Sequence, residues 1–195
     1  MPKILAPNLA LHRERRRQQL MSAAMELALA GGAESITVAA VAAKAGLARS
    51  SIYEYFPSSA DLVTDLVIEE LESYTQQLAQ AVSGVEEPFL RIELWISESL
   101  RYVADGRHML VKSLNTITTP DERKDEILMG HRRMMAPLQQ SLLQTGITDV
   151  RGAAALLASV TDAASMRIDA GNEAELEIQT AVTFALAGLR ALALN

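Results

Sequence analysis

The residues ITVAAVAAKAGLARSSIYEYFPSSADL, numbers 36–62, form the clearest structural pattern in the chain. Their apolar spacing predicts two short helices, residues 38–45 and 48–56, joined by a tight turn at Gly46. Thr37 can cap the first helix through its hydroxyl group, and glycine suits the helix end because it accepts left-handed backbone angles. Two short helices joined in this way form a helix-turn-helix.

The second of these helices has two different faces. Ile52 and Phe56 are four residues apart, so both face a core, whereas Arg49, Ser50 and Tyr53 fall on the outward side. An arginine fork can reach guanine edges or phosphate, and hydroxyl groups commonly contact phosphate oxygens. The outward side therefore favours a DNA-contacting surface. The alternative is a small helical hairpin with exposed polar residues, which leaves the outward tyrosine unexplained.

The charge of the chain is unevenly distributed. The 195 residues carry 18 Lys and Arg against 24 Asp and Glu, a formal net charge of -6 that, if spread evenly, argues against nucleic-acid binding. Residues 1–57 carry seven basic and four acidic side chains, a net +3, so residues 58–195 carry a net -9. The basic segment coincides with the helix-turn-helix, and the acidic remainder discourages DNA from binding elsewhere.

The composition excludes or disfavours several classes of protein and site. Cysteine is absent, which excludes disulfides and Cys-ligated metals, and a hydrophobic content of 49% argues against disorder. His108 and His131 stand alone, so neither a metal site nor a cofactor is expected. We find no targeting sequence and no uncharged apolar stretch long enough to span a bilayer, and we expect a cytoplasmic protein without membrane contact.

Helical periodicity extends over the rest of the chain, which predicts an all-α fold of about nine helices. We expect a flexible arm over 1–12, a helix-turn-helix domain over 13–57 and a C-terminal domain over 58–195. Before the helix-turn-helix we expect a helix over 13–30, and after it a long helix that begins at a capping box of Ser58 and Asp61. Two further helices are expected over 88–104 and 107–116, and another begins at Thr119 with a kink or break near 133–137. The last two helices are expected from Asp149 to Gly171 and from Asn172 or Glu173 to the C-terminus.

Short pieces of sequence in and around the helix-turn-helix have a specific combined spacing. They are Ala23-Ala24-Met25-Glu26-Leu27, Thr37-Val38, Ala42, Ala45-Gly46, Ile52-Tyr53, Tyr55-Phe56, Ser58 and Leu62. Over about residues 13–75, this pattern resembles the tetracycline-repressor (TetR) family of bacterial transcription regulators. One departure is Ala48, which stands where a capping serine or threonine is common in that family.

The resemblance implies roles for matching positions. Thr37 lies where family members contact phosphate, the start of the recognition helix reaches bases and phosphates, and one or both paired tyrosines touch the DNA backbone. The arginines of the first helix could flank the DNA, and Lys44 either helps or is simply solvated. The expected DNA-binding residues are Arg13, Arg16, Arg17, Thr37, Lys44, Arg49, Ser50, Ser51, Tyr53 and Tyr55.

The last two helices are apolar nearly all round. A helix that is apolar on all sides must be buried on all sides, and a C-terminal helix in a domain of this size rarely achieves that within one chain. We therefore expect a homodimer with a two-fold four-helix bundle, the alternative being an alanine-rich core within one chain. The expected interface residues are Leu157, Val160, Ala164, Ile168, Ile178, Val182, Ala185, Leu189 and Leu192.

The middle of the C-terminal domain combines the single tryptophan with most of the methionines. Ligand cavities are mostly apolar with a few polar groups, and methionine adapts to varied shapes, although such a stripe is equally compatible with an ordinary core. The candidate ligand-binding residues are Trp95, Ser99, Tyr102, Met109, Leu114, Met129, Met134, Met135 and Met166.

These features favour a dimeric, ligand-responsive repressor that binds a near-palindromic double-stranded DNA operator. The effector is expected to be an unknown, largely apolar small molecule. We find no catalytic triad, phosphate loop or metal-ligand spacing, so an enzyme is not expected. Two alternatives remain: a constitutive regulator without a ligand, and an all-α small-molecule-binding protein or enzyme whose N-terminal hairpin merely packs.

Overall fold

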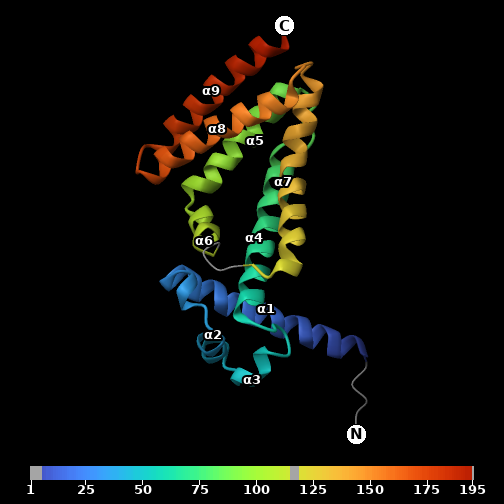
Figure 1. Ribbon diagram of the computed structural model, residues 1–195, viewed down its shortest axis with the longest axis vertical. Coiled ribbons are helices and arrows are strands. Elements are labelled where there is room, and N and C mark those ends of the chain that lie inside the picture. The colour runs from blue at the N-terminus through green and yellow to red at the C-terminus, as the bar shows by residue number, and fades with distance from the viewer. Residues whose placement is uncertain (1–5, 115–118, 195) are drawn as a thin grey trace. The chain divides into compact units, whose positions relative to one another are not determined.

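The computed structural model describes residues 6–114 and 119–194, and every element in these ranges is helical (Figure 1). The all-α prediction is therefore confirmed for the described part of the chain. The elements are α1 Ala6–Gly31, η1 Ala33–Ser35, α2 Val38–Ala45, α3 Arg49–Ile52, α4 Ser59–Ala81, α5 Pro88–Ala104, α6 Arg107–Leu114, η2 Asp121–Arg123, α7 Lys124–Gln144, α8 Val150–Asp169 and α9 Ala174–Ala193.

The chain divides into two compact units whose borders differ from the expected division at residues 57 and 58. The N-terminal unit comprises residues 1–69 together with 110–125, and the C-terminal unit comprises 70–109 together with 126–195. The borders fall inside α4, α6 and α7, so none of these three helices belongs to one unit alone. No linker rich in glycine or proline marks them in the sequence.

The helix-turn-helix forms as predicted. The Thr37 hydroxyl accepts a hydrogen bond from the Ala40 amide at 3.1 Å, which caps α2. Gly46 ends α2 with a φ of +66°, a backbone conformation that costs a residue with a side chain more than it costs glycine. Val38 and Val41 are buried and face α1, so α2 is fixed by its apolar side.

Two helix boundaries differ from the prediction in the N-terminal unit. α1 begins at Ala6, so residues 6–12 continue the helix where an arm was expected; residues 1–5 lie outside the described range. This segment consists mostly of good helix formers, and its proline falls in the first turn, where the missing amide costs least. α3 ends at Ile52, earlier than expected, because the Tyr55 amide bonds the Ile52 carbonyl in a tight turn ahead of Pro57.

Of the kink or break expected near residues 133–137 of α7, the break does not occur. The helix runs from Lys124 to Gln144 through Pro137, preceded by η2. Leu138 and Leu142 are buried directly after the proline, and their packing offsets the one backbone hydrogen bond that proline cannot make. The expected sixth helix stops at Leu114 in the structure, and the remainder of its predicted range lies outside the described residues.

Other helix starts confirm the predicted caps. The Asp61 amide donates to the Ser58 hydroxyl at 3.1 Å at the start of α4, and the Gly152 amide donates to Asp149 at 2.9 Å at the start of α8. Glu87 accepts hydrogen bonds from two amides ahead of α5, and Glu173 does the same ahead of α9. Acidic caps are favourable because a helix N-terminus carries partial positive charge.

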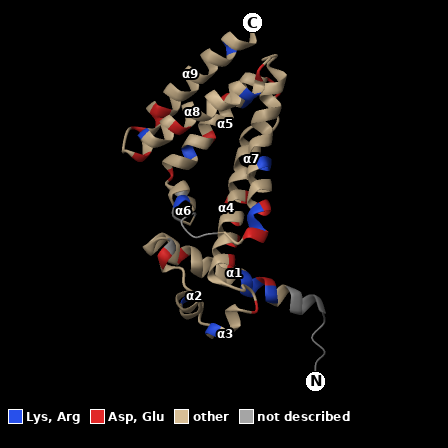
Figure 2. Ribbon diagram, viewed as in Figure 1, with Lys and Arg blue, Asp and Glu red and all other residues tan. Residues whose placement is uncertain are grey.

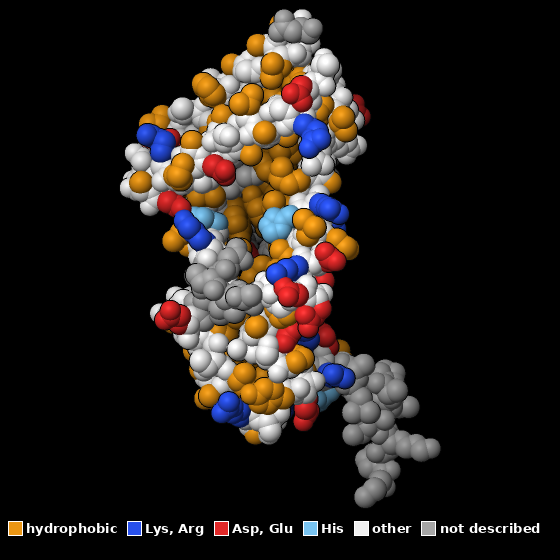
Figure 3. Space-filling model, viewed as in Figure 1, with side chains coloured by type: hydrophobic (Ala, Val, Ile, Leu, Met, Phe, Trp, Pro, Cys, Tyr) orange, Lys and Arg blue, Asp and Glu red, His pale blue; other side chains and the backbone are white. Residues whose placement is uncertain are grey.

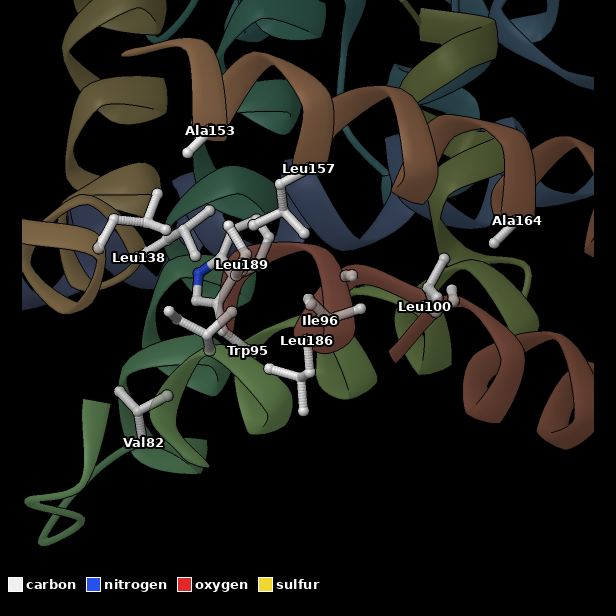
Figure 4. Packing of buried hydrophobic residues seen from close by; sticks show 14 of the residues in the cluster. Val82, Trp95, Ile96, Leu100, Leu138, Ala153, Leu157, Ala164, Leu186 and Leu189 are labelled. Carbon is white, nitrogen blue, oxygen red and sulfur yellow. The ribbon is translucent and has the colours of Figure 1, made fainter. Parts of the chain in front are cut away.

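The core of the C-terminal unit lies where α5 packs against α8 and α9 (Figure 4). α7 adds Leu138 to the same cluster. A close ion pair joins the last turn of α8 to the first turn of α9: Arg167 donates to the two carboxylate oxygens of Glu177 at 2.7 and 2.6 Å. This hydrogen bonding lowers the pKa of Glu177 and raises that of Arg167. The pair links the end of α8 to the start of α9, whose apolar sides pack together.

Among the described helices, α9 is long and apolar enough by length and composition to cross a membrane. A core helix of a globular domain passes the same test. The buried face of α9, which includes Ile178, Ala185 and Leu189, packs within the C-terminal unit. The apolar character of α9 is thus explained on one side by the chain's own core.

Candidate DNA-binding surface and ligand cavity

The two faces predicted for α3 are present in the structure. Ile52 and Phe56 are 0% and 1% exposed, whereas Tyr53 is 48% exposed and Arg49 and Ser50 also face solvent. On the ribbon of Figure 2, basic positions lie along α1 and in the α2–α3 region. Within the described chain, Arg49 has no ion-pair partner, so its guanidinium is available to DNA. Ala48 provides no side-chain cap for α3, because an alanine side chain has no group that can accept a hydrogen bond.

Tyr55 lies half-buried beside α1 and does not share the exposure of Tyr53. The guanidinium of Arg13 lies 6.0 Å from the centre of the Tyr55 ring and donates to the Glu54 carbonyl at 3.2 Å. Arg13 is itself exposed, so it can still reach a phosphate. These contacts hold the turn after α3 against α1, and they give Tyr55 a packing role that the sequence pattern did not distinguish from that of Tyr53.

Arg17 is engaged by an acidic residue on α4. Its guanidinium lies 2.6 Å from one carboxylate oxygen of Asp65, and Arg123 lies 2.6 Å from the other. Arg17 also lies over the ring of Phe56, 5.8 Å from its centre. Asp65 thus holds α1 and the start of the α7 region together within the N-terminal unit. The sequence offers no signal for this cluster, because its members lie far apart along the chain.

The remaining predicted DNA contacts are positioned less directly. Arg16 donates to Gln19 at 3.1 Å, and Lys44 pairs with Glu26 at 2.8 Å on the exposed surface. An exposed pair of this kind is weak, so a phosphate can replace Glu26. The Thr37 hydroxyl is occupied as a helix cap, and Ser51 is half-buried. Arg49, Ser50 and Tyr53 are therefore the most accessible members of the predicted set.

An apolar groove of about 430 Å³ runs along α8 and α9. Leu156 and Phe184 on its walls are 64% and 70% exposed. In Figure 3, hydrophobic side chains are interspersed with charged ones over the upper part of the surface, where α8 and α9 lie. Large apolar side chains exposed together mark an interaction surface. The groove is lined by Ala153, Leu156, Leu157, Ser159, Val160, Ala163, Phe184, Ala185, Gly188, Leu189 and Leu192.

The predicted interface residues divide between this groove and the chain's own core. Leu157, Ala164, Ile178, Ala185 and Leu189 are buried within the C-terminal unit, while Val160, Ile168 and Val182 are half-buried and Leu192 is exposed. The sequence analysis missed Leu156, Phe184 and Gly188. Phe184, Gly188 and Leu192 recur every four residues, a spacing that marks a second stripe on α9 and could have revealed them.

A separate cavity of about 210 Å³ lies inside the C-terminal unit. Of the predicted ligand-binding residues, Trp95, Ser99 and Met135 line it. The sequence analysis missed Tyr74 and the polar side of α8. The full lining is Tyr74, Trp95, Ser99, Leu100, Val103, Met135, Leu138, Ala154, Leu157, Ala158, Thr161, Asp162 and Ser165.

The other predicted ligand-binding residues lie away from this cavity. Tyr102 is buried, stacks on Tyr74 with ring centres 4.0 Å apart, and donates to Glu70 at 3.0 Å. Leu114 is buried in the N-terminal unit, and Met134 packs against the core of the C-terminal unit. The three remaining methionines are on the surface: Met109 is 49% exposed, Met129 55% and Met166 66%. Methionine content alone cannot separate cavity, core and surface positions.

The cavity has a polar side with internal hydrogen bonds. The Ser99 hydroxyl donates to the Trp95 carbonyl at 2.7 Å. Burial raises the pKa of Tyr74, with a smaller opposing effect of the Ser99 hydrogen bond and a further increase from the charge of Glu98. Tyr74 is therefore a neutral phenol at physiological pH. The indole N–H of Trp95 is buried and has no hydrogen-bond partner among the described residues.

The chain is all-α in its described part, and the second helix of its helix-turn-helix has an exposed polar face. These two features are typical of the helix-turn-helix class of DNA-binding proteins. Residues 20–66 match the model of a family described as bacterial regulatory proteins, tetR family. These residues therefore form a DNA-binding region of the tetR-family type, which confirms the resemblance found in the sequence over this segment.

Individual relatives are more distant. The chain is similar to the HTH-type transcriptional repressor KstR of Mycolicibacterium smegmatis, with 28% identity over 83 residues, which spans 43% of this chain and only 41% of that relative. It is 25% identical over 142 residues to the nucleoid occlusion factor SlmA of Pectobacterium carotovorum, covering 72% of each. The regulator FadR of Bacillus subtilis, solved with stearoyl-CoA, shares the fold at a TM-score of 0.70 and 20% identity, with 88% of this chain and 98% of that one covered.

Proposed function

We propose that this regulator is a homodimeric repressor that binds a near-palindromic operator and releases it when a small molecule enters the C-terminal unit. The observation that carries the DNA-binding part is the construction of α3. Arg49, Ser50 and Tyr53 face solvent directly above Ile52 and Phe56, which anchor the helix in the core. A rigidly anchored helix with a polar outer face suits insertion into a major groove.

The apolar groove along α8 and α9 supports dimerisation in this proposal. Leu156 and Phe184 expose large apolar surfaces that a second copy would cover, giving a four-helix bundle. In such a dimer, two copies of α3 would read half-sites about 34–36 Å apart. The same pairing accounts for the apolar outer side of α9 without a membrane, and we place the protein in the cytoplasm.

The effector role rests on the cavity lined by Trp95 and Tyr74. A molecule bound there changes DNA affinity only if it binds two conformations of the protein with different affinity. Repression as the direction of regulation is supported by the name of the KstR relative. The alternative, a constitutive regulator, would bind DNA in the same way but would have no effector.

The DNA-binding part is tested with the intergenic DNA beside the protein's own gene. Arg49→Ala should weaken binding by about 10- to 100-fold, because one bidentate base contact contributes about 1–3 kcal/mol. Tyr53→Phe should weaken it by a few-fold through loss of a phosphate contact. Fluorescence anisotropy at two salt concentrations measures both effects.

The matched control is Arg151→Ala, which removes an exposed arginine from α8 in the C-terminal unit. It should leave DNA affinity unchanged. If Arg49→Ala binds DNA as tightly as the parent protein, α3 is not the recognition helix and the proposal fails.

A further inference from the structure

We propose that the cavity in the C-terminal unit takes a compact organic cation, an apolar body that carries one protonated amine, and that the carboxylate of Asp162 receives the amine at the cavity mouth. The inference rests on the proposed effector role of this cavity and adds the chemical class of the ligand. Three features of the lining carry it: an unpaired carboxylate, hydrogen-bond acceptors on the same side of α8, and apolar walls elsewhere.

The unpaired carboxylate belongs to Asp162. Among the described residues that line the cavity, Asp162 alone is charged at neutral pH, and neither lysine nor arginine lines it. Asp162 is also exposed, which places it at the mouth of the cavity, and it has no ion-pair or hydrogen-bond partner within the described chain. A carboxylate without a partner attracts a cation and repels carboxylates and phosphates.

The α8 side of the cavity presents further acceptors. The Thr161 hydroxyl donates to the Leu157 carbonyl at 2.5 Å, and the Ser165 hydroxyl donates to the Thr161 carbonyl at 2.9 Å. A hydroxyl group has one hydrogen, so in this arrangement both oxygens can only accept a further hydrogen bond. Thr161, Asp162 and Ser165 share one side of α8 because they are three or four residues apart or adjacent. An ammonium group, which has only donors, matches this side.

The remaining lining, from α4, α5 and α7, is largely apolar and aromatic. It includes Tyr74, Trp95, Leu100 and Leu138. The indole nitrogen of Trp95 is itself buried, so a ligand meets the ring and not the N–H group. The Ser99 hydroxyl donates to the Trp95 carbonyl at 2.7 Å, so its hydrogen is also used within the protein. These walls favour an apolar body, whose burial supplies most of the binding energy.

A second carboxylate adds to the negative potential. Burial is the main cause of the raised pKa of Tyr74, and the charge of Glu98 raises it further, so Glu98 acts electrostatically on a phenol that lines the cavity. Arg101 lies 3.8 Å from Glu98 but is 52% exposed and does not line the cavity. An exposed ion pair of this kind is weak, so Arg101 offsets Glu98 only in part. The charges around the cavity therefore favour a cation.

The volume limits the apolar body to a small ring system. The cavity measures about 210 Å³, whereas sites for drug-sized molecules occupy roughly 300–1,000 Å³. A monocyclic or bicyclic amine fits this space, and a long acyl chain does not. Because Asp162 is exposed, the ammonium group at the mouth keeps part of its hydration and avoids the full cost of burying a charge.

The test uses the full-length protein and three ligands built on the same ring. They are cyclooctylamine, which is protonated at neutral pH, the neutral cyclooctanol and the anionic cyclooctanecarboxylate. Calorimetry gives the affinities. Trp95 lines the cavity and is the only tryptophan in the sequence, so its fluorescence gives a second signal from this site.

The amine should bind about fivefold or more tightly than the alcohol, because only the amine gains a charge-assisted hydrogen bond to Asp162. It should bind about tenfold or more tightly than the carboxylate, which Asp162 repels. Both the amine and the alcohol should change the fluorescence of Trp95. An amine that does not saturate the protein, or that binds no more tightly than the alcohol or the carboxylate, would overturn the proposal.

Two pairs of variants connect the result to the cavity. Asp162→Asn keeps the shape of the side chain and should remove the preference for the amine over the alcohol. Glu86→Gln removes an exposed acid of the same unit that does not line the cavity, and it should keep the preference. Ala154→Leu fills part of the cavity and should weaken both ligands, whereas Ala155→Leu, at the exposed neighbouring position, should not. A preference that survives Asp162→Asn would contradict the assigned role of Asp162.

Operator release is measured separately by anisotropy. Amine binding that leaves DNA bound would uphold the ligand class and contradict the effector role. Release of DNA by the carboxylate, without a change in the fluorescence of Trp95, would uphold regulation by a ligand and contradict the ligand class assigned to this cavity.

Discussion

The N-terminal helix-turn-helix and the α8–α9 hairpin present their surfaces in opposite ways. On α3, a polar face with Arg49 and Tyr53 lies outside and Ile52 lies inside, so residue type separates function from core. Along α8 and α9 large apolar residues occur on covered and uncovered sides alike, so residue type does not tell them apart: Leu157 is 3% exposed and its neighbour Leu156 is 64% exposed. A polar functional surface can be recognised by composition, whereas an apolar one requires knowledge of what is already covered.

Among the substitutions that test this comparison, the largest effect, a change of oligomeric state, is expected at Phe184. Phe184→Glu places a charge in the centre of the apolar groove, and burying an unpaired charge is costly enough to shift the dimer to monomer at micromolar concentration. Light scattering after size-exclusion chromatography measures the change.

Leu176→Glu is the matched control, because Leu176 is also an exposed apolar residue of α9 but does not line the groove. It should remain dimeric. Should Leu176→Glu dissociate the protein while Phe184→Glu does not, the groove is not the dimer interface.

The next effect concerns the ionic cluster of the N-terminal unit. Asp65→Ala leaves Arg17 and Arg123 without their shared carboxylate, and Asp65 is only 14% exposed. We expect a loss of about 2 kcal/mol in the free energy of unfolding, less than for a fully buried pair because Arg17 is partly solvated. Urea denaturation followed by circular dichroism measures it.

Asp121→Ala is the control for that experiment, because the ion pair of Asp121 with Lys124 is exposed on both sides. Its stability should match that of the parent protein. An unchanged unfolding midpoint for Asp65→Ala would mean that the cluster around Asp65 contributes nothing to the packing of α1.

The smallest effect is a pH dependence of the α8–α9 hairpin. The hydrogen bond from Arg167 lowers the pKa of Glu177 in the folded protein, so this pair stabilises the fold above the carboxyl's unfolded pKa. The stabilisation is lost as the pH falls through the lowered pKa. Glu177→Gln should therefore have a lower melting temperature than the parent protein at neutral pH. The difference between the two melting temperatures should become smaller in acid.

Melting curves at a series of pH values provide the measurement. Glu175→Gln is the control, since Glu175 is an exposed acid in the same first turn of α9. A constant difference between the Glu177→Gln and parent proteins at every pH would contradict the assigned ion pair.

Much of the fold follows from short-range sequence patterns. The capping side chains of Thr37, Ser58 and Asp149 accept hydrogen bonds from amides three residues further along the chain. The apolar periodicity of α2 and α3 likewise depends on residues three or four apart in the sequence. For the same reason the outward position of Arg49 could be predicted. The start of α1 was misplaced because the sequence prediction began the helix where the charged residues begin, at Arg13, whereas the uncharged residues before it also have the propensity to be helical.

The candidate sites were predicted less completely. Trp95, Ser99 and Met135 line the cavity as expected, but Thr161 and Asp162 join them only because α8 packs across α5. Arg17 was assigned to DNA from its place in a basic cluster, whereas its closest partner, Asp65, lies on another helix. Contacts of this kind depend on how the chain returns on itself.

The sequence by itself determined the helix-turn-helix, its polar outer face and the all-α character of the chain, because these depend on hydrogen bonds and side-chain spacing within a few residues. Only the tertiary structure decided which side of α8 and α9 is left uncovered, which carboxylate Arg17 contacts and which residues of α8 line the cavity with Trp95. The physical reason is that burial and ion pairing are set by neighbours distant in sequence, and nearly uniform apolar helices carry no local record of those neighbours.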